Sequence, residues 1–407
     1  MEQVKERFLR YVAVDTQSAE DRECVPSTAK QFNLARMLCA ELQKMGAEKV
    51  RLDEEHAYVY AFLPGNTEEP LPALGLIAHM DTSPALSGEN VKPRCIPDYD
   101  GQDICLNREK NIWMRVADFP KLADYAGKEL IVTDGTTLLG ADDKAGVAEI
   151  MTLAETLLTH PEIRHRPIAI GFTPDEEVGR GVDFFDIPNF GASEAFTVDG
   201  GALGGIEYET FNAASARVRI SGKSIHPGDA KNKMVNALRI AAELDRLLPE
   251  SQRPEHTEGY EGFYHLDAMH GTVESAAMEY IIRDHDREKF EAKKSLFADC
   301  CAFLNRKYGE ETVTVEIKDS YYNLKDALTE HMDLVSRACA AMREIGVEPV
   351  ISPVRGGTDG CHLSYAGLPC PNLCTGGHNY HGKYEYAVRE SMEKVVELLL
   401  ALAKEPI

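Results

Sequence analysis

The chain has 407 residues and a formal net charge of −23, because it carries 67 acidic but only 44 basic side chains. This charge disfavours binding to nucleic acid or to an anionic membrane surface, since both are negatively charged. No apolar run approaches the ~20 residues of a membrane span.

The N-terminal segment and the ten cysteines favour a cytoplasmic protein. The first 17 residues are amphipathic, with scattered charges and no apolar stretch typical of a secretory signal. Cys370 and Cys374 form a close pair, but no second pair completes a structural zinc site. We therefore expect reduced thiols in a reducing compartment.

In chain order, the first 200 residues alternate short apolar runs with longer helical patterns, which predicts an α/β sheet. The predicted helices span 27–45 and 145–158, and the predicted strands span 58–63, 74–78, 168–173 and 195–198. The last three strands each end on a polar cluster. In open α/β sheets the functional crevice lies outside the carboxyl ends of the strands, so we expect these clusters to share one site.

The pattern changes near residue 210. The following segment predicts a strand at 211–222, a helix at 235–248, a strand at 280–284, a helix at 287–307 and a strand at 312–317. This content suits a small domain with an antiparallel sheet and two helices.

After residue 322 the chain predicts a helix at 324–345, glycine-rich turns and a last helix at 388–403. We interpret this part as a return to the first domain, because chain insertions between nearby termini are well tolerated. The predicted organisation is a first domain formed by residues 1–209 and 322–407, with a smaller α+β domain inserted at 210–321. A chain of this length is expected to form more than one domain.

His79 and Asp81 follow the second of these four predicted strands. Residues two apart in a strand point to the same side, and a metal-binding histidine commonly has its second ring nitrogen tied to a carboxylate. A loop histidine beside a helix-capping aspartate is the alternative reading.

Asp142 and Asp143 lie in the segment LLGADDKAG, directly before a helical pattern. A helix cap needs only one aspartate, which leaves the second acid and the flanking glycines unexplained. A carboxylate shared between two metal ions would explain them.

Three further acids, Glu176, Glu177 and Asp199, follow the predicted strands 168–173 and 195–198. Carboxylates are costly to gather unless cations neutralise them. One glutamate could bind metal and the other act as a base, whereas a solvated acidic turn is the alternative.

A glycine-flanked loop with the sequence GGHNYHG holds His378 and His381. Either histidine could approach a metal site, and a surface turn is the alternative for both.

Together these side chains form a ligand set without cysteine, which suits a hydrolytic zinc, manganese or cobalt site. Two ions that share one carboxylate need about five protein ligands, and the candidates are His79, Asp142, Glu177, Asp199 and His381. Glu176 then remains free to take a proton from a metal-bridging water.

The motifs HMDTSP, LLGADDKAG, FTPDEEVG, TVDGG and GGHNYHG, in this order, resemble those of the co-catalytic zinc exopeptidases. The resemblance covers essentially the whole chain. Four further segments, at 258–266, 281–284, 319–323 and 355–360, resemble the tripeptide aminopeptidases within that family rather than its amino-acid deacetylases and dipeptidases.

The resemblance implies a mixed-sheet zinc-exopeptidase catalytic domain with an inserted lid of the dimerisation type, through which the chain could form a homodimer. It also implies a cytoplasmic enzyme that releases the N-terminal residue of tripeptides. A related di-zinc amidohydrolase, acting on dipeptides or N-acylated amino acids, is the alternative. An inactive relative would be expected to lack a metal ligand or the base. In this sequence no candidate ligand and no candidate base is missing.

By the same resemblance, each subunit would bind two Zn²⁺, with Co²⁺ or Mn²⁺ as substitutes. His79, Asp142 and Asp199 would hold one ion, and Asp142, Glu177 and His381 the other. Asp81 would orient His79, Glu176 would be the general base, and the Asp142–Asp143 peptide bond would be cis.

Three further residues complete the expected site. His226, in SIHPG, resembles a lid histidine that steadies the developing oxyanion and comes from the partner subunit in dimeric relatives. Arg283 and Arg355 resemble positions that bind the C-terminal carboxylate of the substrate, for which a planar guanidinium is well suited. Salt-bridged structural arginines are the alternative.

Overall fold

The structure is a computed structural model that describes residues 3–68 and 70–404. The chain divides into two compact units. The first comprises residues 1–208, 328–351 and 358–407, and the second comprises 209–327 and 352–357.

The second unit includes residues 352–357, which the sequence analysis assigns to the first domain. The difference has a physical cause in backbone hydrogen bonding. The Val354 amide donates to the Glu209 carbonyl at 2.8 Å, and the Phe211 amide donates to the Gly356 carbonyl. This short stretch is therefore held by residues at the start of the insertion.

The first unit is built on an eight-stranded mixed sheet. Its strand order is β1 (Glu48–Leu52), β2 (Val59–Leu63), β8 (Ile168–Thr173), β3 (Leu74–His79), β9 (Glu194–Gly200), β16 (Asn372–Cys374), β10 (Gly205–Glu207) and β15 (Val350–Ile351). The four central strands β8, β3, β9 and β16 run parallel. Their carboxyl ends therefore meet at one edge of the sheet.

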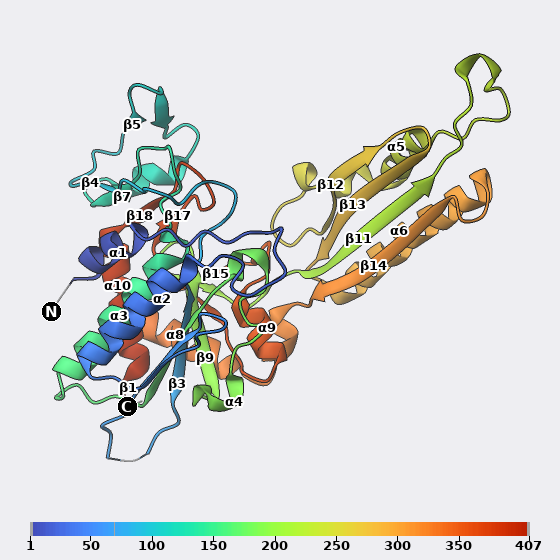
Figure 1. Cartoon of the computed structure of the whole chain (residues 1–407). Coiled ribbons are helices and arrows are strands. Elements are labelled where there is room, and N and C mark those ends of the chain that lie inside the picture. The colour runs from blue at the N-terminus through green and yellow to red at the C-terminus, as the bar shows by residue number, and fades with distance from the viewer. Residues whose placement is uncertain (1–2, 69, 405–407) are drawn as a thin grey trace. The chain divides into compact units, whose positions relative to one another are not determined.

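Helices cover both faces of this sheet (Figure 1). One face packs against α1 (Val4–Val12), α2 (Gln31–Met45), α3 (Ala141–Thr159), α8 (Met332–Glu344) and α10 (Arg389–Ala403), and the other carries α4 (Ile187–Phe190) and α9 (Asp359–Tyr365). Successive side chains of β3 point to opposite faces of the sheet. Leu76 and Ala78 pack on the face covered by the five helices, and Ile77 packs on the face covered by α4 and α9. This burial on both faces explains why the central strands read as continuous apolar runs.

Short strands that the sequence analysis did not predict form two smaller sheets. One has the order β17 (Gly377–His378), β18 (Tyr386–Val388), β7 (Leu130–Val132) and β4 (Arg94–Ile96), and the other pairs β5 (Ile104–Asn107) with β6 (Ile112–Met114). Strands of two to four residues are too short to show an alternating pattern. The connection between β17 and β18 carries His381, one of the candidate ligands.

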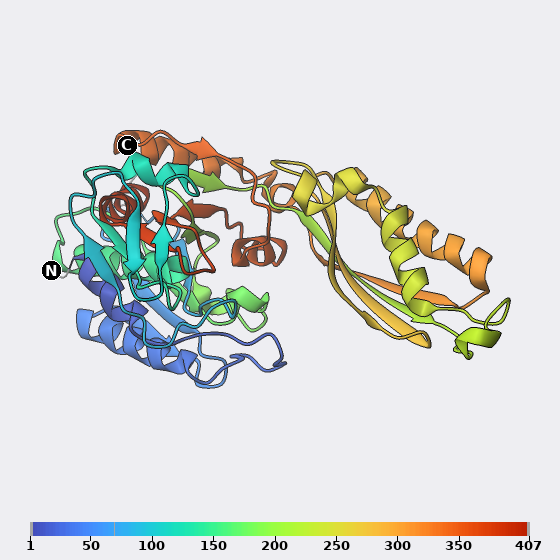
Figure 2. The same cartoon turned by 90° about the horizontal axis from the view of Figure 1, so that it is seen from above.

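The second unit is a four-stranded antiparallel sheet with the order β12 (Phe263–Gly271), β13 (Ser275–Asp284), β11 (Asn212–Ser221) and β14 (Val313–Tyr321). Helices α5 (Ala237–Leu247) and α6 (Arg287–Tyr308) cover one face of it (Figure 2). Along β11, Val218 and Ile220 are buried against these helices, whereas Arg217 and Arg219 are exposed. Strand β12 was not predicted from the sequence.

The predicted helix at 324–345 is two helices, α7 (Leu324–Leu328) and α8. Within the described ranges, no helix is both long and apolar enough to cross a membrane.

Candidate active site

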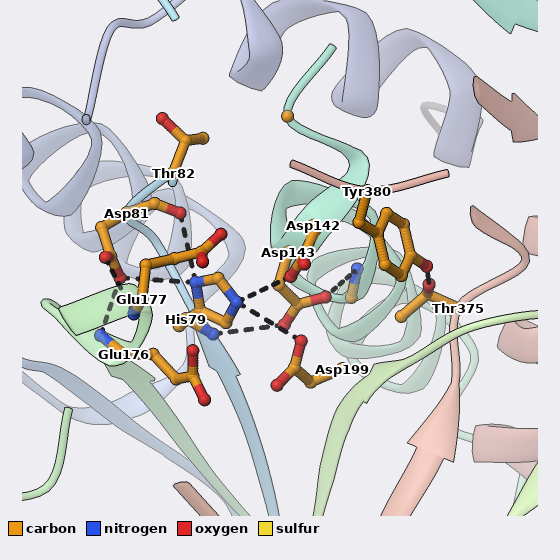
Figure 3. A network of polar contacts seen from close by, with 12 residues as sticks. His79, Asp81, Thr82, Asp142, Asp143, Glu176, Glu177, Asp199, Thr375 and Tyr380 are labelled. Atoms are coloured by element: carbon orange, nitrogen blue, oxygen red, sulfur yellow. Dashed lines mark hydrogen bonds and ion pairs between the residues drawn. The ribbon is translucent and has the colours of Figure 1, made fainter. Parts of the chain in front are cut away.

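His79 stands at the carboxyl end of β3 and is almost fully buried, with 2% of its side chain exposed. Its Nε2 lies 2.9 Å from Asp142 Oδ1 and 3.3 Å from Asp199 Oδ1. Its Nδ1 lies 3.3 Å from Asp81 Oδ1, so the ring stands between Asp81 and the other two acids (Figure 3). This division leaves Nε2 as the nitrogen aimed at the acidic cluster.

Asp142 occupies a non-helical turn (φ −85°, ψ 106°) at the start of α3, and its peptide bond to Asp143 is cis. While Oδ1 faces His79, Oδ2 lies 3.0 Å from His381 Nε2. The two oxygens of one carboxylate thus point to two histidines from distant parts of the chain. This is the arrangement expected of a carboxylate that bridges two metal ions.

Glu176 and Glu177 begin the short 3₁₀ turn η2 (Glu176–Val178), which follows β8 after a left-handed residue, Asp175 (φ 51°). Asp81 accepts the amide of Glu176 at 3.0 Å and that of Glu177 at 3.2 Å. Asp81 therefore holds both His79 and the backbone of the glutamate pair. The Glu177 carboxylate reaches His381, with Oε2 3.0 Å from Nε2.

The structure distinguishes the two histidines of the β17–β18 loop. His381 meets Asp142 and Glu177, as described. The His378 ring packs instead beside Tyr125 and Tyr386, with ring centroids 5.0 and 4.7 Å away. Burial lowers the pKa of His378 to about 4, so it stays neutral at physiological pH. His381 is thus the histidine that joins the acids.

Two groups of side chains could each hold a metal ion, because the ligand atoms within each group all lie within 4.8 Å of one another. One group is His79 with Glu176 and Asp199, and the other is His79 with Asp142 and Glu177. Four of these five residues belong to the ligand set expected from the sequence. The fifth, Glu176, was expected to act as the base, and the expected ligand His381 is in neither group. Pairwise contacts also link His79 to Asp142 and Asp199, and His381 to Asp142 and Glu177. These nitrogen and oxygen donors include no cysteine, with His79 buried, the acids half-buried and His381 exposed. Such a set fits a hydrolytic divalent ion.

The protonation equilibria of these groups are strongly perturbed. Burial raises the pKa of Glu177 and of Asp199 to about 7. Hydrogen bonds to Asp142 and Glu177 raise the pKa of His381 to about 11. Burial also raises the pKa of Glu176 well above its usual range. Gathering so many acids in a buried site favours protons or cations that neutralise them, and divalent ions would do so.

Sequence reasoning missed two buried acids that support the site. Asp359, at the start of α9, accepts a hydrogen bond from Thr173 Oγ1 at 2.7 Å. Glu385 accepts backbone amides from the turn that leads to Asp142. The segment RGGTDG drew attention to Arg355 and not to Asp359, and nothing local marked Glu385, because its partners lie more than 240 residues away.

The two predicted arginines meet within the second unit. Arg283 Nη1 donates to the Arg355 carbonyl at 3.0 Å, and its buried Nε has no hydrogen-bond partner in the part of the chain that is described. Arg355 Nη1 donates to the carbonyls of Gly259 and Glu261, both at 2.9 Å. Arg355 thus also fixes the 257–261 loop.

His226 is exposed in the second unit and directly precedes the turn η3 (Pro227–Asp229). Its Nδ1 accepts the Gly228 amide at 3.2 Å, so Nε2 is the ring nitrogen left to act on a substrate. The roles of His226, Arg283 and Arg355 stay predictions.

Known proteins resemble the chain over nearly its whole length. A family model described as the peptidase dimerisation domain (M20) matches residues 208–310. Peptidase T of Clostridium acetobutylicum is 54% identical over 404 residues, with 99% of each chain covered. Peptidase T of Caldanaerobacter subterraneus subsp. tengcongensis is also 54% identical, with 99% of this chain and 98% of the relative covered.

Solved structures share the fold. The aminopeptidase PepT of Bacillus cereus superposes with a TM-score of 0.77 at 24% identity, over 98% of this chain and 97% of the other. A tripeptidase of Staphylococcus aureus gives 0.79 at 22% identity, with 99% and 97% covered. A dinuclear metal-binding peptidase of the M20 family from Bacillus subtilis gives 0.65 at 14% identity, with 98% and 96% covered. Given the near-complete coverage at 54% identity, the chain belongs to the peptidase T family of M20 peptidases.

Proposed function

We propose that the protein is a dinuclear metallo-aminopeptidase that hydrolyses tripeptides and releases their N-terminal residue. The observation that carries this proposal is Asp142, whose two carboxylate oxygens face His79 and His381 separately. The names of the relatives supply the substrate class, since they include an aminopeptidase and a tripeptidase.

In this proposal, His79, Asp142 and Asp199 would hold one ion, and Asp142, Glu177 and His381 would hold the other. The proposed ion is Zn²⁺, with Co²⁺ or Mn²⁺ as substitutes. When bound, such ions polarise the scissile carbonyl and lower the pKa of water, so that a nucleophile forms at neutral pH.

Glu176 is the general base in this mechanism. Its backbone is fixed by Asp81, and its side chain lies beside His79 and Asp199. From there the carboxylate can accept a proton from the attacking water and return it to the leaving amine. Asp81 keeps His79 Nε2 directed at the acids by engaging Nδ1.

The second unit would recognise the substrate. Arg283 and Arg355 would bind the C-terminal carboxylate, and His226 would stabilise the developing oxyanion. The match to a dimerisation domain supports a homodimer formed through this unit, with His226 supplied by the partner subunit.

A substrate panel tests the proposal. The full chain is assayed with tripeptides, dipeptides and N-acetylated amino acids, before and after chelation. We expect cleavage of free-amine tripeptides, loss of activity on chelation and recovery with Zn²⁺ or Co²⁺. Activity that survives complete chelation, or cleavage confined to dipeptides or acylated amino acids, would overturn it.

A further inference from the structure

Glu385 is a buried acid that serves the turn before α3. It is only 2% exposed, and its carboxylate accepts three backbone amides, those of Leu139 at 2.7 Å, Gly140 at 2.9 Å and Asp142 at 3.1 Å. A carboxylate accepts hydrogen bonds without donating any when ionised, so it matches three converging amides. The last of these amides belongs to the residue that faces both histidines.

The same loop supplies Glu385 and His381, four residues apart between β17 and β18. Asp142 therefore meets this loop twice, through its amide at Glu385 and through Oδ2 at His381 Nε2, 3.0 Å away. The first contact sets where the Asp142 backbone stands with respect to the histidine. A loss of that contact would let the turn and the loop move apart.

The His79 side of the cluster is held independently. β3 and β9 are neighbouring paired strands, with Leu76 opposite Phe196 and Ile77 opposite Thr197, and His79 is held by Asp81. The relative position of His79 and Asp199 thus depends on strand pairing and on Asp81, whereas the position of His381 relative to Asp142 depends on the loop that Glu385 anchors.

We propose that Glu385 is a positioning residue that sets the spacing between Asp142 and His381, and so controls the affinity of the ion held by Asp142, Glu177 and His381. The inference rests on the proposed two-ion site. It assigns to Glu385 no contact with substrate or with an ion.

The test is metal binding by the metal-free full chain. Co²⁺ is titrated into the wild type and into Glu385→Gln, with calorimetry and visible absorption as readouts. Glutamine keeps one acceptor oxygen but turns an NH₂ donor toward the amides, so the anchor is lost with little change in volume. We expect two binding steps in the wild type. In the variant, the step that depends on His381 should weaken by about 10- to 100-fold, and the other step, which shares Asp142 but not His381, should weaken much less.

The matched control is Glu390→Gln. Glu390 also accepts a backbone amide, that of Glu129 at 3.1 Å, but this amide is not in the Asp142 turn. We expect this variant to keep both steps. A general loss of packing would instead weaken metal binding in both variants, or weaken both steps equally.

The inference would be overturned if a folded Glu385→Gln variant bound both ions with wild-type affinity. It would also be overturned if the affinities for both ions fell equally. Should circular dichroism show that this variant is unfolded, Glu385→Asp replaces it, since a side chain shorter by one methylene cannot hold all three amides in place. The same criteria then apply. A wild type that binds fewer than two ions would overturn the proposed function itself, which separates the two failures.

Discussion

The main sheets of the two units differ in strand direction and in burial, and only that of the first unit gathers the candidate site residues at one edge. In the first unit, β3, β8 and β9 run parallel, so His79, the Glu176–Glu177 turn and Asp199 emerge at one edge. In the second unit all neighbouring strands are antiparallel, so successive strand ends lie at opposite edges. Parallel pairing thus brings ligands together, whereas the antiparallel sheet offers one apolar and one polar face.

The largest effect is expected for Glu176, the proposed general base at the parallel edge. Glu176→Gln removes the proton acceptor while keeping the shape of the side chain, so kcat should fall by about three orders of magnitude. Tripeptide turnover is measured together with metal content, which should stay at the wild-type level. Near-normal turnover would remove Glu176 from this role.

Alanine substitutions at adjacent positions of one strand should change the unfolding free energy differently in the two sheets. On β3, Leu76→Ala and Ile77→Ala should each lower the unfolding free energy by about 2–5 kcal/mol, because both side chains are fully buried. On β11, Ile220→Ala should have a similar cost, but Arg219→Ala should stay within about 0.5 kcal/mol.

Denaturant unfolding of the four variants is the measurement. Similar losses for Ile220 and Arg219 would contradict the one-sided burial of the second sheet.

A smaller effect is expected for the arginines of the second unit. Arg283→Met should raise KM for tripeptides by about 10- to 100-fold, the value of a hydrogen bond to a charged group. Arg355→Met should raise KM similarly and also loosen the 257–261 loop, whose carbonyls it binds. Steady-state kinetics with limited proteolysis distinguishes the two. An unchanged KM in both variants would assign the arginines a structural role only.

The smallest effect, taken over a single pH unit, is the pH dependence of metal binding. In the metal-free protein, His381 has a pKa of about 11, and Glu177 and Asp199 each have a pKa of about 7. Binding needs all three deprotonated. Throughout pH 6–8, binding of the ion should therefore release one proton from His381. The affinity for the ion should then rise by about tenfold per pH unit.

Below pH 7 the two carboxylates are also protonated and must release their protons when the ion binds. The affinity should therefore depend more steeply on pH in that range. Co²⁺ affinities measured from pH 6 to 8 check this. A pH-independent affinity would contradict the perturbed pKa values.

The strand-end clusters were predictable because each follows a recognisable apolar strand; β8 has the predicted bounds, 168–173. The choice between His378 and His381 was not predictable from the loop residues alone, since it depends on the packing of His378 beside Tyr125, more than 250 residues earlier in the chain. The resemblance to the zinc exopeptidases supplied that assignment.

Glu385 and the short strands were out of reach for a related reason. The partners of Glu385 are backbone amides distant in sequence, and β18 pairs with the equally distant β7. Residue type at a single position carries no information about such pairing. The strands β5 and β6 pair locally, but they are too short to show an alternating pattern. Residues 352–357 likewise join the second unit through carbonyls and amides and not through an apolar pattern.

The return of residues 352–357 to the second unit affects how that unit could be produced as a separate fragment. The chain enters the second unit twice, so a continuous fragment of residues 209–327 would lack Arg355. Without that side chain, the carbonyls of Gly259 and Glu261 and the hydroxyl of Thr257 lose a shared donor. Excision at the obvious boundaries would therefore yield a piece whose 257–261 loop has lost its anchor, and a fusion that restores 352–357 would be needed to recover it.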